Sequence, residues 1–228
     1  MNLRPRLKMA ADMVRSGSRF ADIGTDHAYL PAWLILNGIC NSGIASDLRK
    51  SPLENAAQTL RVYNIEEKIS LRLSDGLDCI SGGECDDIVF AGMGGTLIKE
   101  ILERTNWIKD KSKRLIIQPM SHSEDVRIYL CENGFEIIKE SACVDDGRDY
   151  ICFCAEYKGS DCKKSGLYYF TGVHPIPGND ASKRYYDRQI KWLNTRCSSL
   201  DNAGIYSEEY YYLKNILHEY EVTQNGKS

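Results

Sequence analysis

The chain has 228 residues, of which 43% are hydrophobic and 27% are charged, and its 29 Lys and Arg against 32 Asp and Glu give a net charge of −3. This composition is typical of a globular protein and excludes a disordered, collagen-like or coiled-coil-only chain. The small acidic excess argues against a basic surface over the whole protein, although a local basic patch could still bind RNA.

No apolar run approaches the ~18 residues that a transmembrane helix needs. The basic segment 1–19 lacks the apolar stretch of a secretory signal. The nine cysteines are scattered, with no C-x-x-C pair and no Cys/His cluster, so we expect neither zinc nor a disulfide framework. These features predict a cytoplasmic protein with no metal site and no membrane attachment.

Short runs rich in Ile, Val and Phe alternate with helical patterns over the first 134 residues. We expect strands at 20–23, 43–47, 69–73, 87–91 and 115–117, and helices at 27–37, 52–63, 96–103 and 124–133. Ser51 is the expected N-cap of the second helix, with Pro52 at its first position. This alternation predicts a parallel sheet covered by helices on both faces.

The pattern then changes, because two strand-like runs, 135–144 and 150–157, follow each other without a helix between them. Asp146 and Gly147 lie between the runs, and Asp-Gly is a strong signal for a hairpin turn. An α/β sheet that ends in an antiparallel hairpin is the Rossmann-like arrangement of class I methyltransferases rather than of dehydrogenases, an argument by analogy of folds.

A Gly- and Pro-rich link is predicted at 166–178. Beyond it, apolar residues recur at spacings of three and four over 186–200 and 210–220, with a turn at 201–204. Such seams predict a small antiparallel helical hairpin with coiled-coil-like packing. We therefore expect a methyltransferase domain at 1–160 and a C-terminal two-helix domain at 161–228.

Acidic and glycine residues follow four of the predicted strands, at the edge where open α/β sheets bind ligands. They are Asp22, Gly24 and Asp26 after the first strand, Asp47 after the second, Asp75 and Gly76 after the third, and Gly92 and Met93 after the fourth. Each alone is explained as a turn or helix-cap residue. Together they favour S-adenosylmethionine, whose ammonium, ribose and adenine amino groups suit carboxylates. The NAD fingerprint G-x-G-x-x-G is absent.

The strings ADIGTDHAYLP at 21–31, DGL at 75–77, AGMGG at 91–95 and LIIQP at 115–119 resemble the bacterial tRNA methyltransferases that modify N1 of adenine 22. The resemblance covers residues 3–157 and extends in outline to the C-terminal helices. It implies S-adenosylmethionine as cofactor and tRNA as substrate. It also implies that the eight acidic, glycine and methionine residues named above contact the cofactor.

The implied reaction needs little acid–base chemistry, since the lone pair of adenine N1 can attack the sulfonium methyl directly. The adenine must be unpaired or flipped first, because N1 lies on its Watson–Crick edge. We expect Gly94, Gly95, Gln118 and Pro119 to form the target pocket. His27 is a candidate catalytic residue, although a structural histidine at a helix start explains it equally well.

Two residues depart from the pattern of the resembling family and are expected to border the target pocket. Met120 follows Gln118-Pro119 where Asn is expected, and Ile151 follows Tyr150 where Glu is expected.

Two segments are basic, residues 1–20 and residues 183–196, each with a net charge of +4. Arg184, Arg188 and Lys191 lie at i, i+4 and i+7, on one helical stripe that could contact tRNA phosphates, as could Arg6. A solvated helix face is the other explanation of that stripe.

Two alternatives stay open. The chain could be a class I methyltransferase for another RNA site or a small molecule, or a catalytically inactive RNA-binding relative. No feature indicates an obligatory protein partner.

Overall fold

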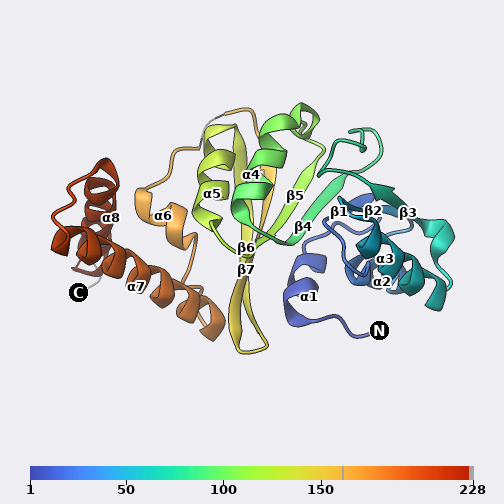
Figure 1. Ribbon diagram of the computed structural model, residues 1–228, viewed down its shortest axis with the longest axis horizontal. Helices are drawn as coiled ribbons and strands as arrows, with labels where there is room; N and C mark the ends of the chain where they lie inside the picture. The colour runs from blue at the N-terminus through green and yellow to red at the C-terminus, as the bar shows by residue number, and fades with distance from the viewer. Residues whose placement is uncertain (161, 226–228) are drawn as a thin grey trace.

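The computed structural model describes residues 1–160 and 162–225, and it contains a seven-stranded sheet with the order β3-β2-β1-β4-β5-β7-β6 (Figure 1). The first five strands pair in parallel, whereas β7 is antiparallel to both β5 and β6. The predicted Rossmann-like sheet that ends in an antiparallel hairpin is therefore confirmed.

The predicted helices and strands are present in the predicted order, with two unpredicted helices, α1 and α6, in addition. The strands are β1 (Phe20–Ile23), β2 (Gly43–Asp47), β3 (Ile69–Leu73), β4 (Asp87–Met93), β5 (Arg114–Pro119), β6 (Phe135–Asp145) and β7 (Arg148–Tyr157). The α-helices are α1 (Pro5–Ala11), α2 (Tyr29–Leu36), α3 (Lys50–Val62), α4 (Gly95–Arg104), α5 (Ser123–Glu132), α6 (Gly166–Thr171), α7 (Asp180–Asn202) and α8 (Glu208–Asn225). Short 3-10 turns lie at Glu66–Lys68 and Asn106–Ile108.

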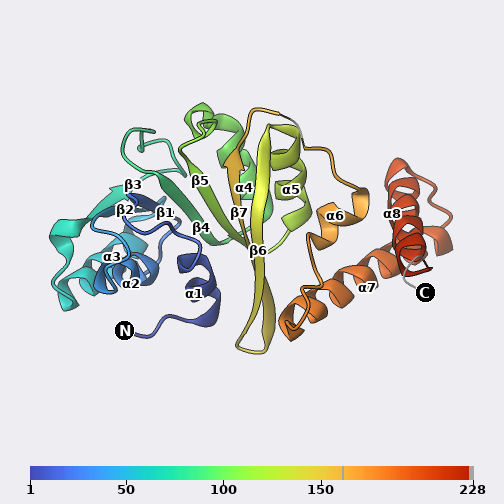
Figure 2. The same ribbon diagram turned by 180° about the vertical axis from the view of Figure 1, so that it is seen from behind.

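The sheet is covered on both faces, with α1, α2 and α3 on one side and α4 and α5 on the other (Figures 1 and 2). Along β4, Ile88 and Phe90 pack into the core under α4 and α5, while Val89 packs into the core under α1 and α2. This alternation follows from the two-residue period of a strand. It leaves only the two ends of the strands free to carry chemistry.

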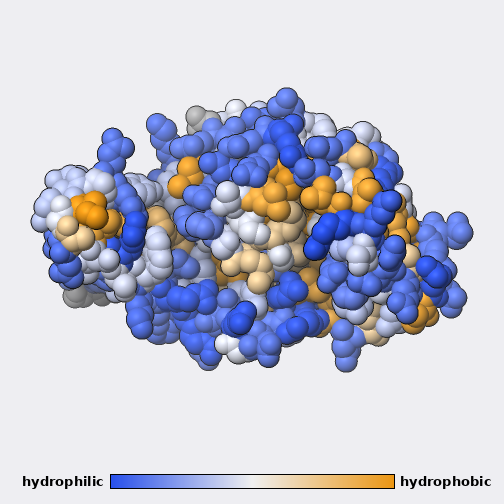
Figure 3. Space-filling view, viewed as in Figure 1, coloured by the Kyte–Doolittle hydropathy of each residue, from blue (hydrophilic) through white to orange (hydrophobic). Residues whose placement is uncertain are grey.

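The surface in Figure 3 is mostly hydrophilic, and its hydrophobic residues gather over the middle, where α4 lies. α4 carries the exposed Leu97. Within the described residues, no helix combines the length and the apolar character needed to cross a membrane.

The hairpin turn consists of two residues, Asp146 and Gly147, and Asp145 pairs directly with Arg148. Both turn residues have positive φ, at 51° and 70°. A two-residue turn of this kind matches the twist of the flanking strands and favours Asp-Gly. The predicted turn is correct, and the flanking strands extend to it from both sides.

The start of α3 differs from the prediction. The helix begins at Lys50 with Arg49 as its N-cap, so Ser51 and Pro52 lie inside the first turn, and no side chain caps it. The first four N–H groups of a helix have no partner within the helix. Proline, which lacks this group, is therefore tolerated at the third helical position as well as at the first.

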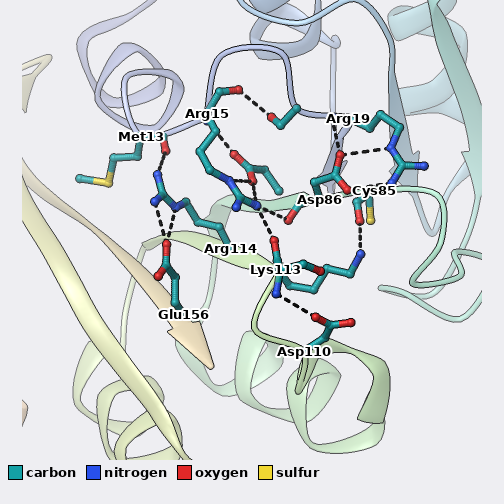
Figure 4. A network of polar contacts seen from close by, with 12 residues as sticks. Met13, Arg15, Arg19, Cys85, Asp86, Asp110, Lys113, Arg114 and Glu156 are labelled. Carbon is teal, nitrogen blue, oxygen red and sulfur yellow. Dashed lines mark hydrogen bonds and ion pairs between the residues drawn. The ribbon is translucent and has the colours of Figure 1, made fainter. Parts of the chain in front are cut away.

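Ion pairs fasten the amino-terminal edge of the sheet (Figure 4). Asp87 is fully buried and accepts hydrogen bonds from the backbone N and Nε of Arg15, both at 2.7 Å. Arg19 donates to Asp86 at 2.7 Å and lowers the pKa of that carboxyl to about 2. Arg114 donates to Glu156 at 2.7 Å. Asp87, Asp86 and Glu156 therefore each have an arginine partner.

The C-terminal segment forms three helices rather than two. α6 occupies the predicted link, and its Leu167 and Phe170 join Leu193, Leu213 and Ile216 in a separate hydrophobic cluster. Ser165 caps α6 by accepting from the N–H of Tyr168, a local signal that glycine and proline obscured. The expected seams of α7 and α8 do line this cluster.

The first half of α7 packs on β6 and β7, while its second half packs on α8, so one helix spans both parts of the molecule (Figure 1). Tyr185, near the start of α7, belongs to the core of the sheet. The predicted division places its second unit at residue 161, which lies outside the described residues.

A fully buried ion pair joins the sheet to the C-terminal segment. Arg127 of α5 donates to Glu140 of β6 at 2.8 Å and to the carbonyl of Tyr169 at 3.1 Å. His174 lies 3.5 Å from the same Glu140 carboxylate. Because these groups come from three segments and are shielded from water, we assign them to holding α6 and α7 against the sheet.

Candidate active site

The carboxyl ends of the strands are joined to one another by backbone hydrogen bonds. The N–H groups of Gly24 and Thr25 donate to the carbonyl of Ser46, at 2.9 and 2.8 Å, and the N–H of Ser74 donates to that of Asp47 at 2.9 Å. On the other side, Met120 donates to the carbonyl of Met93 at 2.8 Å. The four groups of residues expected to bind the cofactor therefore lie along one edge.

Asp22, at the end of β1, is the most unusual carboxylate of this edge. It is 6% exposed, and burial raises its pKa to about 7, against a smaller opposing effect of its hydrogen bond with the Thr25 hydroxyl. It has no ion pair among the described residues. Burial of an unpaired carboxylate costs free energy, and a cationic ligand would supply the missing partner.

Asp47, at the end of β2, is 9% exposed and keeps one carboxylate oxygen available. Its other oxygen, Oδ1, accepts from the backbone N–H of Arg49 at 2.8 Å and lies 3.6 Å from Nε of the same arginine. The next residue, Leu48, is 64% exposed. A fixed carboxylate beside an exposed apolar side chain suits a ribose joined to a flat base.

Asp75 follows β3 and is exposed, with Arg104 of α4 donating to its Oδ1 at 2.5 Å. Gly76 has φ of 55°, and a Cβ there would lie 2.7 Å from Ile101, so α4 approaches too closely for any other residue. Because Arg104 donates to Oδ1 of Asp75, only the second oxygen of this carboxylate is available for an adenine amino group.

Gly92 interrupts the pairing of β4 with β5, where Ala91 opposes Gln118 and Met93 opposes Pro119. Its φ is 92°, and it is exposed. Such bulges are frequent beside active sites, where they redirect the chain. The bulge turns this backbone away from the regular ladder.

Gly24 is placed against Met93, since a Cβ on it would lie 3.0 Å from the Met93 sulfur. Its φ of 75° also requires glycine. This contact brings the β1 and β4 loops together. Asp26, expected to bind the cofactor, is exposed and lies 3.4 Å from His27 Nε2.

His27 precedes α2 and is 40% exposed at its side chain. Its ring stacks on that of Tyr29, with centroids 5.0 Å apart and an interplanar angle of 11°. Ala28 between them has a positive φ of 51°, which delays the start of the helix to Tyr29. The pair offers an exposed aromatic surface at the end of β1.

Of the four residues expected in the target pocket, Gly95, Gln118 and Pro119 are buried, although Pro119 also lines a surface cleft. Gly95 donates to the carbonyl of Ser121 at 2.9 Å, and a Cβ on it would collide with the same backbone. Its role is close packing of α4 against the loop after β5. Gly94 is half-buried and remains beside the bulge.

Gln118 is fully buried, so it cannot contact a substrate directly. Its Oε1 accepts from Arg6 at 3.3 Å, and its Nε2 donates to the carbonyl of Pro119 at 3.2 Å. Arg6 Nη1 would lie 3.1 Å from a Cβ on Gly92. The structure thus brings Arg6, expected to bind RNA, to the same edge as the glycine bulge.

The two basic segments are largely neutralised. In residues 1–20, Arg4 and Arg6 approach Asp145, Lys8 pairs with Asp12, Arg15 with Asp87, and Arg19 with Asp86. The sequence could not reveal these pairs, because most of the partners are 60 or more residues away. The N-terminal segment is therefore not the free basic surface that the sequence predicts, because its cations form ion pairs that stabilise the fold.

On α7, two of the three residues of the expected stripe also have partners. Arg184 Nη2 lies 2.9 Å and Arg188 Nη1 3.7 Å from the carboxylate of Asp149, at the start of β7. Both guanidiniums are about half exposed. Lys191 is exposed and has no side-chain partner among the described residues.

Three residues that the motifs did not single out as site residues also lie at this edge. Leu48 and Tyr29 are exposed apolar side chains adjacent to expected site residues, a signal visible in the sequence. Arg104 reaches Asp75 from a helix 29 residues later, which only the fold reveals. Among the described residues, no group of His, Cys, Asp and Glu could hold a metal ion.

The side chains fit S-adenosylmethionine. Its ammonium matches the buried carboxylate of Asp22, its ribose hydroxyls match Asp47, and its adenine matches Leu48 with the free oxygen of Asp75. This edge offers the buried carboxylates of Asp22 and Asp47, and the arginines beside its acids, Arg49 and Arg104, are paired with Asp47 and Asp75. Such a set suits a cationic ligand better than a pyrophosphate.

Comparison with known proteins agrees with this geometry. Residues 3–153 match the family described as "Methyltransferase domain". The tRNA (adenine(22)-N(1))-methyltransferase of Bacillus subtilis is 36% identical over 176 residues, which cover 76% of this chain and 73% of that protein.

Solved structures agree as well. The crystal structure of the B. subtilis m1A22 tRNA methyltransferase TrmK has a TM-score of 0.82 at 28% identity and covers 98% of both chains. A putative tRNA (m1A22) methyltransferase of Streptococcus pneumoniae, in complex with S-adenosyl-L-methionine, has a TM-score of 0.79 at 30% identity, covering 95% of this chain and 100% of that one. The chain belongs to the tRNA (adenine(22)-N(1))-methyltransferase family.

Proposed function

We propose that this protein methylates N1 of adenine 22 in tRNA with S-adenosylmethionine as the methyl donor. The observation that carries the proposal is Asp22, a carboxylate at the end of β1 that is buried and has no ion pair within residues 1–160 and 162–225, in a chain of this family. The protein acts in the cytoplasm, where its tRNA substrate is found.

Each of the cofactor-binding residues contacts a different part of S-adenosylmethionine. Asp22 holds the ammonium, Asp47 the ribose hydroxyls, and Asp75 with Leu48 the adenine. When bound, S-adenosylmethionine supplies a methyl group on a sulfonium, which the lone pair of adenine N1 accepts without a general base. Catalysis then depends on alignment and on dipoles that favour the positive charge of the product.

The target side consists of the Gly92 bulge, Gly94 and Pro119. The glycines let backbone carbonyls approach a flat base and accept from its exocyclic amino group. Arg6 and Gln118 act as positioning residues, since their hydrogen bond fixes the β5 end against the bulge. The exposed stack of His27 and Tyr29 provides a platform for a flipped adenine.

The experiment compares methyl transfer to a tRNA transcript with adenine 22 and to the same transcript with guanine 22. We expect transfer only to the first, at N1, with loss of activity in Asp22→Asn. Asp26→Asn, which changes an exposed neighbouring carboxylate, is the matched control and should retain more activity.

The two alternatives give different results. Equal methylation of both transcripts would identify another RNA site, and methylation of neither would leave a small-molecule substrate. No thermal shift with S-adenosylmethionine would identify a relative that does not bind the cofactor.

A further inference from the structure

A cleft of about 540 Å³ lies between the loop that follows β5, the turn of the β6–β7 hairpin and the side of α7. Its walls include Met120, His122, Arg148, Phe170, Arg188 and Trp192. Figures 1 and 2 both show the first turns of α7 beside the hairpin. This volume is within the range of small-ligand sites, about 300–1,000 Å³.

Trp192 gives the cleft an aromatic wall. The indole is 46% exposed, and it stacks on Phe170 with ring centroids 5.7 Å apart and an interplanar angle of 24°. Phe170 is 5% exposed and belongs to the C-terminal hydrophobic cluster, so it supports the indole from behind. A supported indole with a free face is suited to stacking on a nucleobase.

The cleft also offers an unpaired cation, although its two arginines, Arg148 and Arg188, are matched in number by two acids, Asp149 and Glu124. Arg148, beside the hairpin turn, is exposed and has no side-chain partner among the described residues. Asp149 is shared by two arginines, Arg184 and Arg188, so this ion-pair group keeps a net positive charge. The other acid, Glu124, lies 3.5 Å from His122. Arg148 is therefore the cation of the cleft that can contact a phosphate.

The cleft adjoins the proposed target pocket. Pro119 lines it and is also the last residue of β5, opposite Met93 of the glycine loop. Met120, the next residue, lines the cleft and donates its backbone N–H to Met93. A base in the target pocket would therefore have its neighbours in the chain close to the mouth of the cleft.

We propose that this cleft binds one of the two nucleotides that flank the target adenine, with the base stacked on Trp192 and the phosphate at Arg148. The inference rests on the proposed function. In this proposal the C-terminal helices do more than contact tRNA phosphates, because α7 supplies one wall of a nucleotide-binding site.

The test measures KM and kcat with a tRNA transcript, and Kd for S-adenosylmethionine, in Trp192→Ala, Trp192→Phe and wild type. Trp192→Ala should raise the KM for tRNA about tenfold, since base–aromatic stacking contributes about that factor or more, with kcat and cofactor affinity unchanged. Trp192→Phe should recover most of the loss. Tyr211→Ala is the control, because Tyr211 is an exposed aromatic residue of α8 outside the cleft.

Transcripts that are abasic on either side of adenine 22 locate the stacked base. On one of them, wild type and Trp192→Ala should have the same KM, because the base that Trp192 contacts is missing. A KM difference that persists on both abasic transcripts, or is absent on the intact one, would overturn the inference.

Arg148→Ala gives an independent measurement if Trp192→Ala fails to fold. It should reduce the salt dependence of tRNA binding by about 0.7 to 0.9 log units per log unit of salt. An unchanged slope would contradict the phosphate contact. A wild-type protein that does not methylate adenine 22 would refute the proposed function instead, which keeps the two failures distinct.

Discussion

Asp87 and Asp22, buried carboxylates at opposite edges of the sheet, are in opposite electrostatic states. At the amino-terminal edge, buried Asp87 is held by Arg15, and Arg19 lowers the pKa of Asp86 to about 2 (Figure 4). At the carboxyl-terminal edge, Asp22 is also buried but has no cationic partner among the described residues, and burial raises its pKa to about 7.

The difference separates structural carboxylates from ligand-binding ones. A paired carboxylate contributes to folding, while an unpaired buried one destabilises the fold and gains its partner only when a cation binds. Variants at the two edges should therefore have opposite effects on stability and on cofactor affinity.

The largest effect is expected from Arg15→Ala, which leaves the Asp87 carboxylate buried and unpaired. The free energy of unfolding should fall by about 3 to 5 kcal/mol, with cofactor affinity unchanged in the folded fraction. Chemical denaturation provides the measurement. Arg19→Ala is the control and should cost about 1 kcal/mol or less, because that pair is partly exposed. Equal losses in both variants would contradict the distinction.

Asp22→Asn should produce the reverse result. Removing the carboxylate that holds the ammonium should weaken S-adenosylmethionine binding by about 3 kcal/mol, or roughly a hundredfold. The unfolding free energy of the cofactor-free protein should not decrease, because an unpaired buried charge has been removed. Calorimetry and denaturation of the same preparation test both. A destabilised variant with normal affinity would place Asp22 among the structural residues.

Asp47→Ala should weaken cofactor binding by about 1.5 to 3 kcal/mol, the range of charge-assisted hydrogen bonds. Calorimetry on the folded variant measures this. An unchanged dissociation constant would mean that other groups bind the ribose.

Cofactor affinity should depend on pH through Asp22. Its pKa is raised to about 7 in the cofactor-free fold, from an ordinary value of 3.8, so the carboxyl is mostly protonated below pH 7 and must ionise to bind an ammonium. Affinity should therefore fall by up to about tenfold per pH unit below 7. The same shift means that this group destabilises the cofactor-free fold increasingly as pH rises from about 4 to about 7.

Titrations between pH 5.5 and 7.5 test this dependence. Asp22→Asn should lose it and Asp47→Ala should keep it. A wild-type affinity that is constant over this range would contradict the assignment of the ammonium to Asp22.

The smallest effect is expected at α7, where the same distinction separates Lys191 from Arg184. Lys191 has no side-chain partner in the part of the chain that the structure describes, so Lys191→Ala should reduce the salt dependence of tRNA binding by about 0.7 to 0.9 log units per log unit of salt. Arg184→Ala should change it less, because its charge is already engaged by Asp149. A filter-binding series at several salt concentrations would measure both slopes, and a larger change in Arg184→Ala would reverse the assignment.

The sequence by itself determined the order of the strands and helices, the hairpin turn at Asp146 and Gly147, and the placement of acids and glycines at the strand ends. These features depend on the periodicity of neighbouring residues and on the backbone preferences of glycine and aspartate. Even α6 had a local signal, the cap at Ser165, which the glycine and proline content concealed.

Only the tertiary structure decided which charges are free. Arg15 contacts Asp87, which is 72 residues away in the chain, and Arg6 contacts Gln118, which is 112 residues away. The basic N-terminal segment therefore stabilises the fold through ion pairs, and Arg6 lies beside the glycine bulge. The same holds for Arg184 with Asp149 and for the cleft that Trp192 lines. Pairing and burial depend on residues that are distant in the chain, and no local pattern records their approach.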